Sequence, residues 1–169
     1  LTKKVYNSVG TPGTIPNDLA VPLAARMKPN QYLAPKGDRS LMLSSAQSAA
    51  MVGALKGLFQ DSSAIKKQYA EGMMGRTSGF DWYENESIYT HTRGTATTGT
   101  VTTTIATNGA SVISLSGLGA STTIKKGDVF TIAGVYAVHP ETKAVRGSLQ
   151  QFVVTADATA SAGGVAATV

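Results

Sequence analysis

The fold is decided by the stretch KKGDVFTIAGVYAVHPETKAVRGSLQQFVVT, residues Lys125–Thr155. It holds two runs with the period of two that is typical of β-strands, Asp128–Tyr136 and Leu149–Thr155. Lys125–Asp128 predicts a turn before the first run, because Gly127 can adopt a positive φ without steric cost. The stretch therefore predicts a β-hairpin that supplies about half of a small antiparallel barrel and needs partners on both edges.

The same period predicts which side chains face the core of that barrel. Four large apolar residues fall on one side of the pleat: Phe130, Ile132, Phe152 and Val154. Gly134 interrupts the first run, as a bulge or a barrel corner requires. His139–Thr142 is expected to form the connecting turn, because Pro140 has no N–H to donate to a ladder.

Neighbouring segments offer further strands for the barrel. Thr100–Ala106 and Ser111–Leu115 are short β-prone runs, and the Asn-Gly pair within Thr107–Ala110 predicts a hairpin between them. Ala156–Gly164 is small and loose, and Val165–Val169 after the Gly163-Gly164 pair is expected to complete the barrel. We therefore expect residues 92–169 to form a β-barrel domain.

Residues 18–91 predict a different, α/β segment. Asp18–Lys28 has helical character with Asn17 as a plausible N-cap, and Pro22 is tolerable only in the first turn of that helix. Pro29 is expected to end it. Residues 1–17, rich in turn formers, read as an irregular arm or connector that neighbouring subunits hold in place.

A strand–helix–helix–strand succession follows. Arg39–Leu43 predicts a strand buried on both faces, and Ser44-x-x-Gln47 predicts a capping box that opens a helix. Asp61 is expected to cap a second helix through Glu71, and Gly79–Tyr89 alternates as a strand. One apolar stripe at helical spacing should face the core: Met51, Val52, Leu55, Leu58 and Phe59. The fold class predicted for the whole chain is α+β, with an α/β segment followed by an antiparallel barrel and a boundary near Thr92.

Composition restricts the classes of function. The net charge of +5 comes from scattered basic residues, which favours a generally basic domain over a nucleic-acid-binding one. The absence of cysteine excludes disulfides and thiol catalysis, and no apolar run approaches the roughly 20 residues of a membrane span. Charged residues are 15% of the chain, well below the usual ~25%, which suits a protein whose surface is largely covered by neighbours.

No catalytic, cofactor-binding or metal-binding residue is expected. His91 and His139 lie in different regions without the further ligands that a zinc or iron site needs, so surface positions are expected for both. Asp81 alternates away from Glu84 and Glu86, which indicates solvated carboxylates rather than a shared acid–base site. Gly117-Leu118-Gly119 precedes no predicted helix that could receive a phosphate, so it predicts a turn.

Two longer strings resemble a known family. AQSAAMVGALKGLFQDSSAIKKQYAEGMMGRTSGFDWYENESI (Ala46–Ile88) resembles the gene-five-type major coat protein of short-tailed phages. KKGDVFTIAGVYAVHPETKAVRGSLQQFVVTAD (Lys125–Asp157) is similar to the β-domain inserted in that family. The resemblance covers most of Asp18–Asp157, and GRTSGFDWYE and GDVFTIAGV are its more specific strings.

The resemblance implies a Hong-Kong-97-like capsid fold, with residues 18–91 in the axial α/β domain and residues 92–169 in the inserted β-barrel. It implies a structural virion protein without catalytic residues, assembled in the bacterial host cytoplasm. The partners it implies are other copies in hexamers and pentamers, scaffolding and portal proteins, and packaged DNA through indirect, non-specific contact, with no membrane. The chain lacks the spine helix and extended loop of a complete coat protein, so a fragment is expected. Some relatives contact a neighbouring capsomer through a long charged loop of the inserted domain, and the short Thr107–Ala110 loop puts that contact in doubt.

Two other classes of function compete with this interpretation. The Thr- and Ser-rich β region suggests a phage adhesin or a carbohydrate-binding module, which should expose aromatic side chains over a groove. Tyr136 is the main aromatic candidate in the barrel. A hydrolase is the third class, and the chain lacks the residues for its mechanism.

Overall fold

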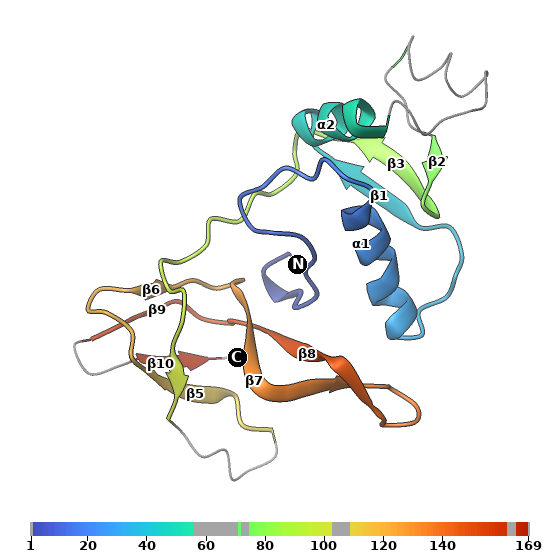
Figure 1. Cartoon of the computed structure of the whole chain (residues 1–169). Helices are drawn as coiled ribbons and strands as arrows, with labels where there is room; N and C mark the ends of the chain where they lie inside the picture. Colours follow the sequence, from blue (N-terminus) through green and yellow to red (C-terminus); the bar gives the residue numbers. More distant parts are fainter. Residues whose placement is uncertain (1, 56–70, 72–74, 103–108, 162–164, 169) are drawn as a thin grey trace. The chain divides into compact units, whose positions relative to one another are not determined.

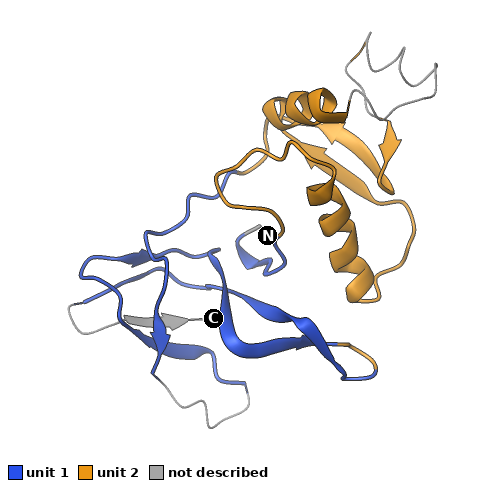
Figure 2. Cartoon of the chain, in the orientation of Figure 1, with its two compact units in different colours: residues 1–8, 90–138, 142–169 blue, residues 9–89, 139–141 orange. Residues whose placement is uncertain are grey.

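The computed structural model describes residues 2–55, 71, 75–102, 109–161 and 165–168. In these residues it is a mixed α+β structure with helices and several small sheets (Figure 1). The chain divides into two compact units (Figure 2). Unit 1 comprises Leu1–Ser8, Thr90–Val138 and Thr142–Val169, and unit 2 comprises Val9–Tyr89 and His139–Glu141.

Unit 2 is built on a three-stranded sheet in the order β1-β3-β2. Strands β1 (Ser40–Leu43) and β3 (Phe80–Glu84) are parallel, and β2 (Arg76–Thr77) runs antiparallel to β3. The β2–β3 turn consists of Ser78 and Gly79, both at positive φ, which is the geometry of a tight type I′ hairpin. The alternation predicted for Gly79–Tyr89 is thus confirmed as a strand that ends at Glu84, whereas no strand was predicted where β2 lies.

Helix α2 (Ser45–Leu55) begins at the predicted capping box. The Gln47 N–H donates to Ser44 Oγ at 3.4 Å, and the Ser44 N–H donates back to Gln47 Oε1 at 3.2 Å. The helix packs its apolar side on the sheet, where Leu43, Met51 and Leu55 form the buried core with Trp82 against them. The first half of the predicted stripe is confirmed, while Leu58, Phe59 and the second helix predicted from Asp61 to Glu71 fall largely outside the described residues.

Helix α1 (Ala20–Gln31) differs from its predicted bounds at both ends. Pro22 lies in the first turn, as expected, but Asp18 rather than Asn17 hydrogen-bonds the first turn, accepting from the Ala20 N–H at 3.3 Å. Pro29 does not end the helix. Proline at that position removes only one ladder hydrogen bond near the C-terminus, and the turn still closes through Tyr32 N–H to Lys28 O and Ala34 N–H to Pro29 O.

The chain leaves α1 through a residue in a costly backbone conformation. Leu33 has φ 58° and an exposed side chain, although this region of φ favours glycine at helix ends. We expect Leu33→Gly to raise the free energy of unfolding by about 0.5–1 kcal/mol, measured by denaturant titration. Leu33→Ala removes the same side chain but keeps the Cβ, so it should give no such gain, and equal gains in both variants would contradict the backbone argument.

Strand β1 is covered on one face only, which corrects the prediction of a strand buried on both faces. Leu43 is buried and Leu41 packs on the core, whereas Met42 is 55% exposed. Met42 is paired with Tyr83 on β3, which is 56% exposed. The open face of the sheet in unit 2 therefore carries two large apolar side chains next to each other.

The described residues of unit 1 form three small antiparallel sheets. The first contains β10 (Val165–Thr168), β5 (Val112–Ser116) and β4 (Thr100–Val101), in that order. The second pairs β6 (Thr123–Ile124) with β9 (Ala158–Thr159). The third is the hairpin of β7 (Val129–Val138) and β8 (Val145–Val153). A short 3-10 helix, η1 (Thr2–Lys4), belongs to the same unit.

Both strands of the β7–β8 hairpin were predicted, and so was their irregularity, but β8 begins four residues before the predicted run Leu149–Thr155 and ends two residues before the end of that run. Thr131 pairs with Gln151, but the next pair is Tyr136 with Leu149, so β7 carries extra residues between them. Gly134 lies in this bulge with φ 82°. The predicted turns at both ends are also present, one over Pro140–Thr142 and one at Lys126-Gly127, where the Asp128 N–H donates to Lys125 O at 2.9 Å.

The described residues of unit 1 do not form the closed barrel that was predicted. Its core holds Ile113, Ile124, Val154 and Ala160, with Phe130 and Ile132 packed against it. Phe152 lies outside that cluster and stacks on Phe130 with ring centroids 5.7 Å apart. The loose segment predicted for Ala156–Gly164 instead contains β9 and the buried Ala160. The Gly163-Gly164 pair, Val169 and the first half of the Thr107–Ala110 loop lie outside the described residues.

The N-terminal arm was predicted to depend on neighbouring subunits, and part of it is instead attached within unit 1. Ser8 is bound to the Gln151 side chain of β8. The Ser8 N–H donates to Gln151 Oε1 at 3.2 Å, and Gln151 Nε2 donates to Ser8 O at 3.1 Å. The side-chain amide of Gln151 thus bonds the backbone N–H and C=O of Ser8, as the backbone of a neighbouring strand would.

Candidate functional site

The most connected polar group in unit 1 is the carboxylate of Asp128, which lies in the turn before β7. Its Oδ1 lies 2.7 Å from Nε2 of His91, and its Oδ2 accepts the N–H of Lys125 at 2.8 Å and of Gly94 at 3.1 Å. The Asp128 side chain is 12% exposed. The carboxylate of Asp128 therefore connects residues 91–94, which lead into unit 1, with the 125–128 turn at the start of β7.

Two glycines make this junction possible. At Gly94 a Cβ atom would overlap the Thr123 carbonyl group and would lie 3.0 Å from Asp128 Oδ2. At Gly127, φ is 99° and a Cβ would lie 3.3 Å from His91 Cε1. Gly94 is required because the Thr123 backbone approaches it closely, and Gly127 is required because of its positive φ. The sequence indicated the requirement at Gly127 but not the one at Gly94.

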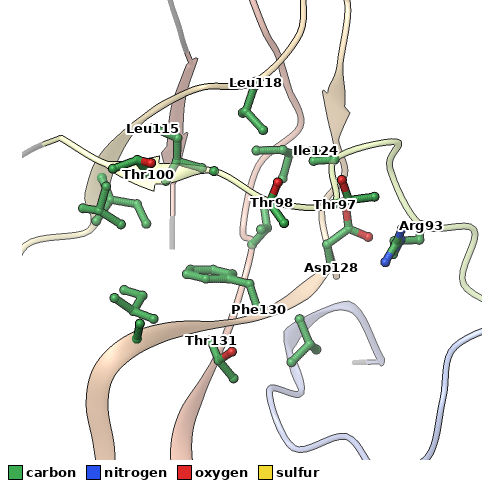
Figure 3. A pocket seen from close by; sticks show the side chains of 18 of the residues that line it. Arg93, Thr97, Thr98, Thr100, Leu115, Leu118, Ile124, Asp128, Phe130 and Thr131 are labelled. Atoms are coloured by element: carbon green, nitrogen blue, oxygen red, sulfur yellow. The ribbon is translucent and has the colours of Figure 1, made fainter.

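Next to this junction is a pocket of about 800 Å³, which we call the seam pocket. It lies between residues 96–101, which lead into edge strand β4, and residues 129–133 of edge strand β7 (Figure 3). Its lining includes apolar side chains from strands β5, β6 and β7, from the loop after β5 and from the residue after β8: Ile113, Leu115, Leu118, Ile124, Phe130 and Val154. The pocket thus lies between strands of two separate sheets, β4 in one and β7 in the other.

The charged side chains that line the seam pocket lie at one end of it (Figure 3). Arg93 and Asp128 are its charged residues, and the carboxylate of Asp128 is already bound within the junction. Arg93 has an exposed side chain and makes no hydrogen bond or ion pair to any residue that the structure describes. The seam pocket thus combines a long apolar wall with one uncommitted positive charge.

The structure places the residues that sequence analysis considered for chemistry in separate locations. His91 is partly buried and bound to Asp128 rather than fully at the surface, and His139 accepts the Glu141 N–H on Nδ1 at 3.3 Å in the hairpin turn. The Gly117-Leu118-Gly119 segment is a bend with Gly117 at φ 77°. His91 was missed as a structural residue because its partner is 37 residues away in the sequence.

The carboxylates of Glu84, at the end of β3, and of Glu86, just after it, meet at the start of α2. Ser45 N–H donates to Glu86 Oε1 at 2.7 Å, and Ser45 Oγ donates to Glu84 Oε1 at 2.8 Å. Negative charge at a helix N-terminus is favourable, because unpaired backbone N–H groups point outward there. Both carboxylates are exposed, as expected, but they act as a cap on α2.

This cap predicts a pH dependence. The Ser45 hydroxyl and then the Ser45 N–H lower the pKa of Glu86 from its ordinary 4.5. We ascribe more of the effect to the N–H, because the hydroxyl bond of 2.8 Å goes to Glu84. A lowered pKa in the folded state means that the contribution is present above pH 4.5 and is lost as the pH falls through the lowered value.

We therefore expect Glu86→Gln to be less stable than the wild type at pH 7, with the difference shrinking below pH 4.5. Denaturant titrations at pH 7 and at pH 3 measure it, with Glu141→Gln as a control for the loss of one exposed carboxylate. A difference between wild type and Glu86→Gln that is the same at both pH values would contradict the assignment.

Among the described residues no group of three or more His, Cys, Asp or Glu side chains is arranged to hold a metal ion. None of the described helices has the length and apolar character to cross a membrane. No protein-family model matches the chain, and a search of curated proteins finds no match to it.

Proposed function

We propose that the chain is a structural virion protein, a subunit of the icosahedral head of a short-tailed phage or prophage. In this proposal residues 18–91 belong to an axial α/β domain of the Hong-Kong-97-like type, and residues 92–169 belong to an inserted β-domain whose described strands do not close into a barrel. We propose this family because Ala46–Ile88 and Lys125–Asp157 resemble the gene-five-type coat proteins.

The observation that carries the proposal is the large apolar surface that unit 2 leaves in water. A folded monomer normally exposes large apolar residues singly, and contiguous exposed patches mark interaction sites. Leu23 and Met27 are one turn apart on α1 and therefore share a face, and Met42 and Tyr83 are neighbours on the open face of the sheet. The exposed large apolar residues of unit 2 are Val9, Ile15, Leu23, Met27, Leu33, Met42, Tyr83 and Tyr89.

The small buried core of unit 2 favours the same conclusion. Its cluster of buried side chains contains Leu43, Met51 and Leu55 among the described residues, and Phe80 is buried as well. Contacts with other copies would bury apolar side chains of the described residues that the unit itself leaves exposed. A subunit of a closed shell has neighbours on most sides and can maintain such a surface.

Electron microscopy of the protein after expression in a bacterial host tests the proposal. Rings of five or six copies, or closed shells, are expected. Double substitution of Leu23 and Met27 by Ser should reduce assembly, whereas Lys36→Ser, an exposed residue beyond the C-terminus of α1, should not. A wild-type protein that forms no rings or shells and binds polysaccharide through its β region would favour the carbohydrate-binding alternative instead.

A further inference from the structure

The positive charge of the chain is concentrated in unit 1. Unit 1 contains seven Lys and Arg residues but only two acidic residues, Asp128 and Asp157, so its formal charge is +5. Unit 2 contains eight Lys and Arg residues and eight acidic residues, so it is formally neutral. The whole net charge of +5 therefore belongs to the unit that is built of β-strands, and such an asymmetry between units points to an anionic partner.

The fold brings the lysines of η1 to the turn at residues 125–128. The atoms nearest to the position that a Cβ of Gly127 would take include Lys3 Cα and Lys3 Cγ, both at 3.3 Å. Lys4 follows Lys3 in η1, and Lys125 and Lys126 directly precede Gly127. Two pairs of lysines that are far apart in the sequence therefore meet at one turn.

A third segment adds Arg93 to this turn. His91 Nε2 lies 2.7 Å from Asp128 Oδ1, and the Gly94 N–H donates to Asp128 Oδ2 at 3.1 Å, so residues 91–94 are attached to the turn from both sides of Arg93. Arg93 lies near Asp128 at the end of the seam pocket (Figure 3). We call the five exposed cations that gather here the basic cluster: Lys3, Lys4, Arg93, Lys125 and Lys126.

The two carboxylates of unit 1 leave most of this charge unbalanced. Asp128 and Asp157 both accept backbone N–H groups of the turn, and the Asp128 side chain is only 12% exposed. Within the part of the chain that the structure describes, neither carboxylate forms an ion pair with a Lys or Arg side chain. The five cations of the basic cluster therefore outnumber the carboxylates beside them and are available to an external anion.

The residue types in the basic cluster fit phosphate groups. Four of the five are Lys, whose ammonium group is a compact point charge on a flexible stem and neutralises phosphates without a fixed geometry. Base edges are read mainly by side chains that form two hydrogen bonds at once, such as Arg, Asn and Gln. A surface made of Lys therefore favours contacts to a phosphate backbone, which carry no sequence information.

We propose that the basic cluster binds the phosphate backbone of nucleic acid directly and without sequence preference. The lysines of η1 and of the 125–128 turn neutralise phosphates, and Arg93 adds a contact beside the seam pocket. The choice of nucleic acid as the polyanion rests on the proposed function, a head subunit that encloses DNA. The resemblance to coat proteins implies only indirect contact with DNA, so a direct phosphate-binding surface goes beyond it.

The salt dependence of DNA binding by the whole chain tests the proposal. We expect fluorescence anisotropy with a labelled duplex of arbitrary sequence to show an affinity that falls about 250-fold between about 50 and 200 mM NaCl, as four to five neutralised phosphates require. Lys125→Gln combined with Lys126→Gln should reduce that fall to about 20-fold and weaken binding about ten-fold or more at the lowest salt concentration, because two phosphate contacts are lost.

Two further double variants keep the result interpretable. Lys3→Gln with Lys4→Gln should have the same effect as the change in the turn, because both pairs belong to one surface. Lys36→Gln with Lys143→Gln makes the same change in net charge at exposed positions outside the basic cluster, and it should bind the duplex like the wild type. The Gln variants of the turn keep the backbone bonds to Asp128 and Asp157, so denaturant titration should show an unchanged free energy of unfolding.

The outcomes separate this inference from the proposed function. Cluster variants that bind DNA with the same salt dependence as the Lys36 and Lys143 control would overturn the inference and leave the proposed function standing. Vesicles of anionic phospholipid that bind more tightly than the duplex at equal phosphate concentration would overturn the choice of nucleic acid. A wild-type chain that binds DNA through the basic cluster but forms no rings or shells would support this inference and contradict the proposed function.

Discussion

Replacing Gly94 with Ala is expected to destabilise unit 1 by about 3 kcal/mol, although the change adds a single methyl group. Gly94 is buried where the entering segment crosses β6, and its backbone N–H donates to Asp128. A Cβ atom at this position would overlap the Thr123 carbonyl oxygen and would lie 2.9 Å from the Thr123 carbonyl carbon. Backbone atoms cannot rotate away from such a contact as the end of a side chain can.

The cost comes from the hydrogen bonds that hold the crossing in place. To relieve the overlap, the segment around Gly94 must move away from Thr123, which lengthens the bond from the Ala96 N–H to Thr123 O, now 3.1 Å. The same movement withdraws the buried Gly94 N–H from the Asp128 carboxylate. A buried donor left without an acceptor costs about 1–3 kcal/mol, in addition to the cost of overpacking.

Hydrogen exchange of peptides that cover Thr123–Asp128 measures this effect locally. Gly147→Ala is the matched control, because Gly147 lies on β8 of the same unit, has no positive φ, and has nothing within 4 Å of the position of its Cβ. We expect strong loss of protection in Gly94→Ala and little change in Gly147→Ala. Equal protection in the two variants would mean that the backbone crossing at Gly94 accommodates a side chain.

The β7–β8 hairpin and the start of α2 could be predicted because their signals are local. The period of two predicted the strands on either side of Pro140, and Gly134 predicted the bulge in the first of them. The spacing of Ser44 and Gln47 predicted the capping box. Each of these rests on residues within a few positions of one another. The steric and hydrogen-bonding rules that act over such distances do not depend on the rest of the fold.

Features that depend on distant partners could not be predicted in this way. Met42 lies in an apolar run that fits a strand covered on both faces, but α2 packs on only one of them. Strands β2 and β9 are two residues long, too short for any period, and exist because β3 and β6 lie beside them. Pro29 is an unfavourable helix residue by propensity, and the closing bonds after it decide where α1 ends.

The seam pocket illustrates the same limit for function. The strand patterns indicated enough β-structure for a barrel, but closure depends on whether two edges meet in register, and the sequence of one strand does not specify this. Arg93, at the end of the pocket, has no motif around it that would distinguish it from a solvated residue. Its position beside the apolar lining of the pocket follows only from the fold.

Replacing Asp128 with Ala is expected to lower the free energy of unfolding of unit 1 by about 3–4 kcal/mol. The carboxylate accepts from the Lys125 and Gly94 N–H groups and lies 2.7 Å from His91 Nε2. Hydrogen bonds to a charged acceptor contribute about 1.5–3 kcal/mol each, and the loss of a shared acceptor is less than additive because its donors relax together. Asp128→Asn keeps the size and one acceptor oxygen but turns an NH₂ group toward N–H donors, so a cost of about 2 kcal/mol is expected.

Asp157 provides the comparison for this junction, since it accepts one backbone N–H, from Lys126 at 2.6 Å, in the same turn and is exposed. Asp157→Ala should therefore cost about 1 kcal/mol in the same denaturant titration. If the carboxylate organises the junction, Asp128→Ala combined with Gly94→Ala should be less destabilising than the sum of the two, because both break the bond between Gly94 and Asp128. A cost for Asp128→Ala no larger than that for Asp157→Ala would show that the 125–128 turn holds the start of β7 by its backbone bonds alone.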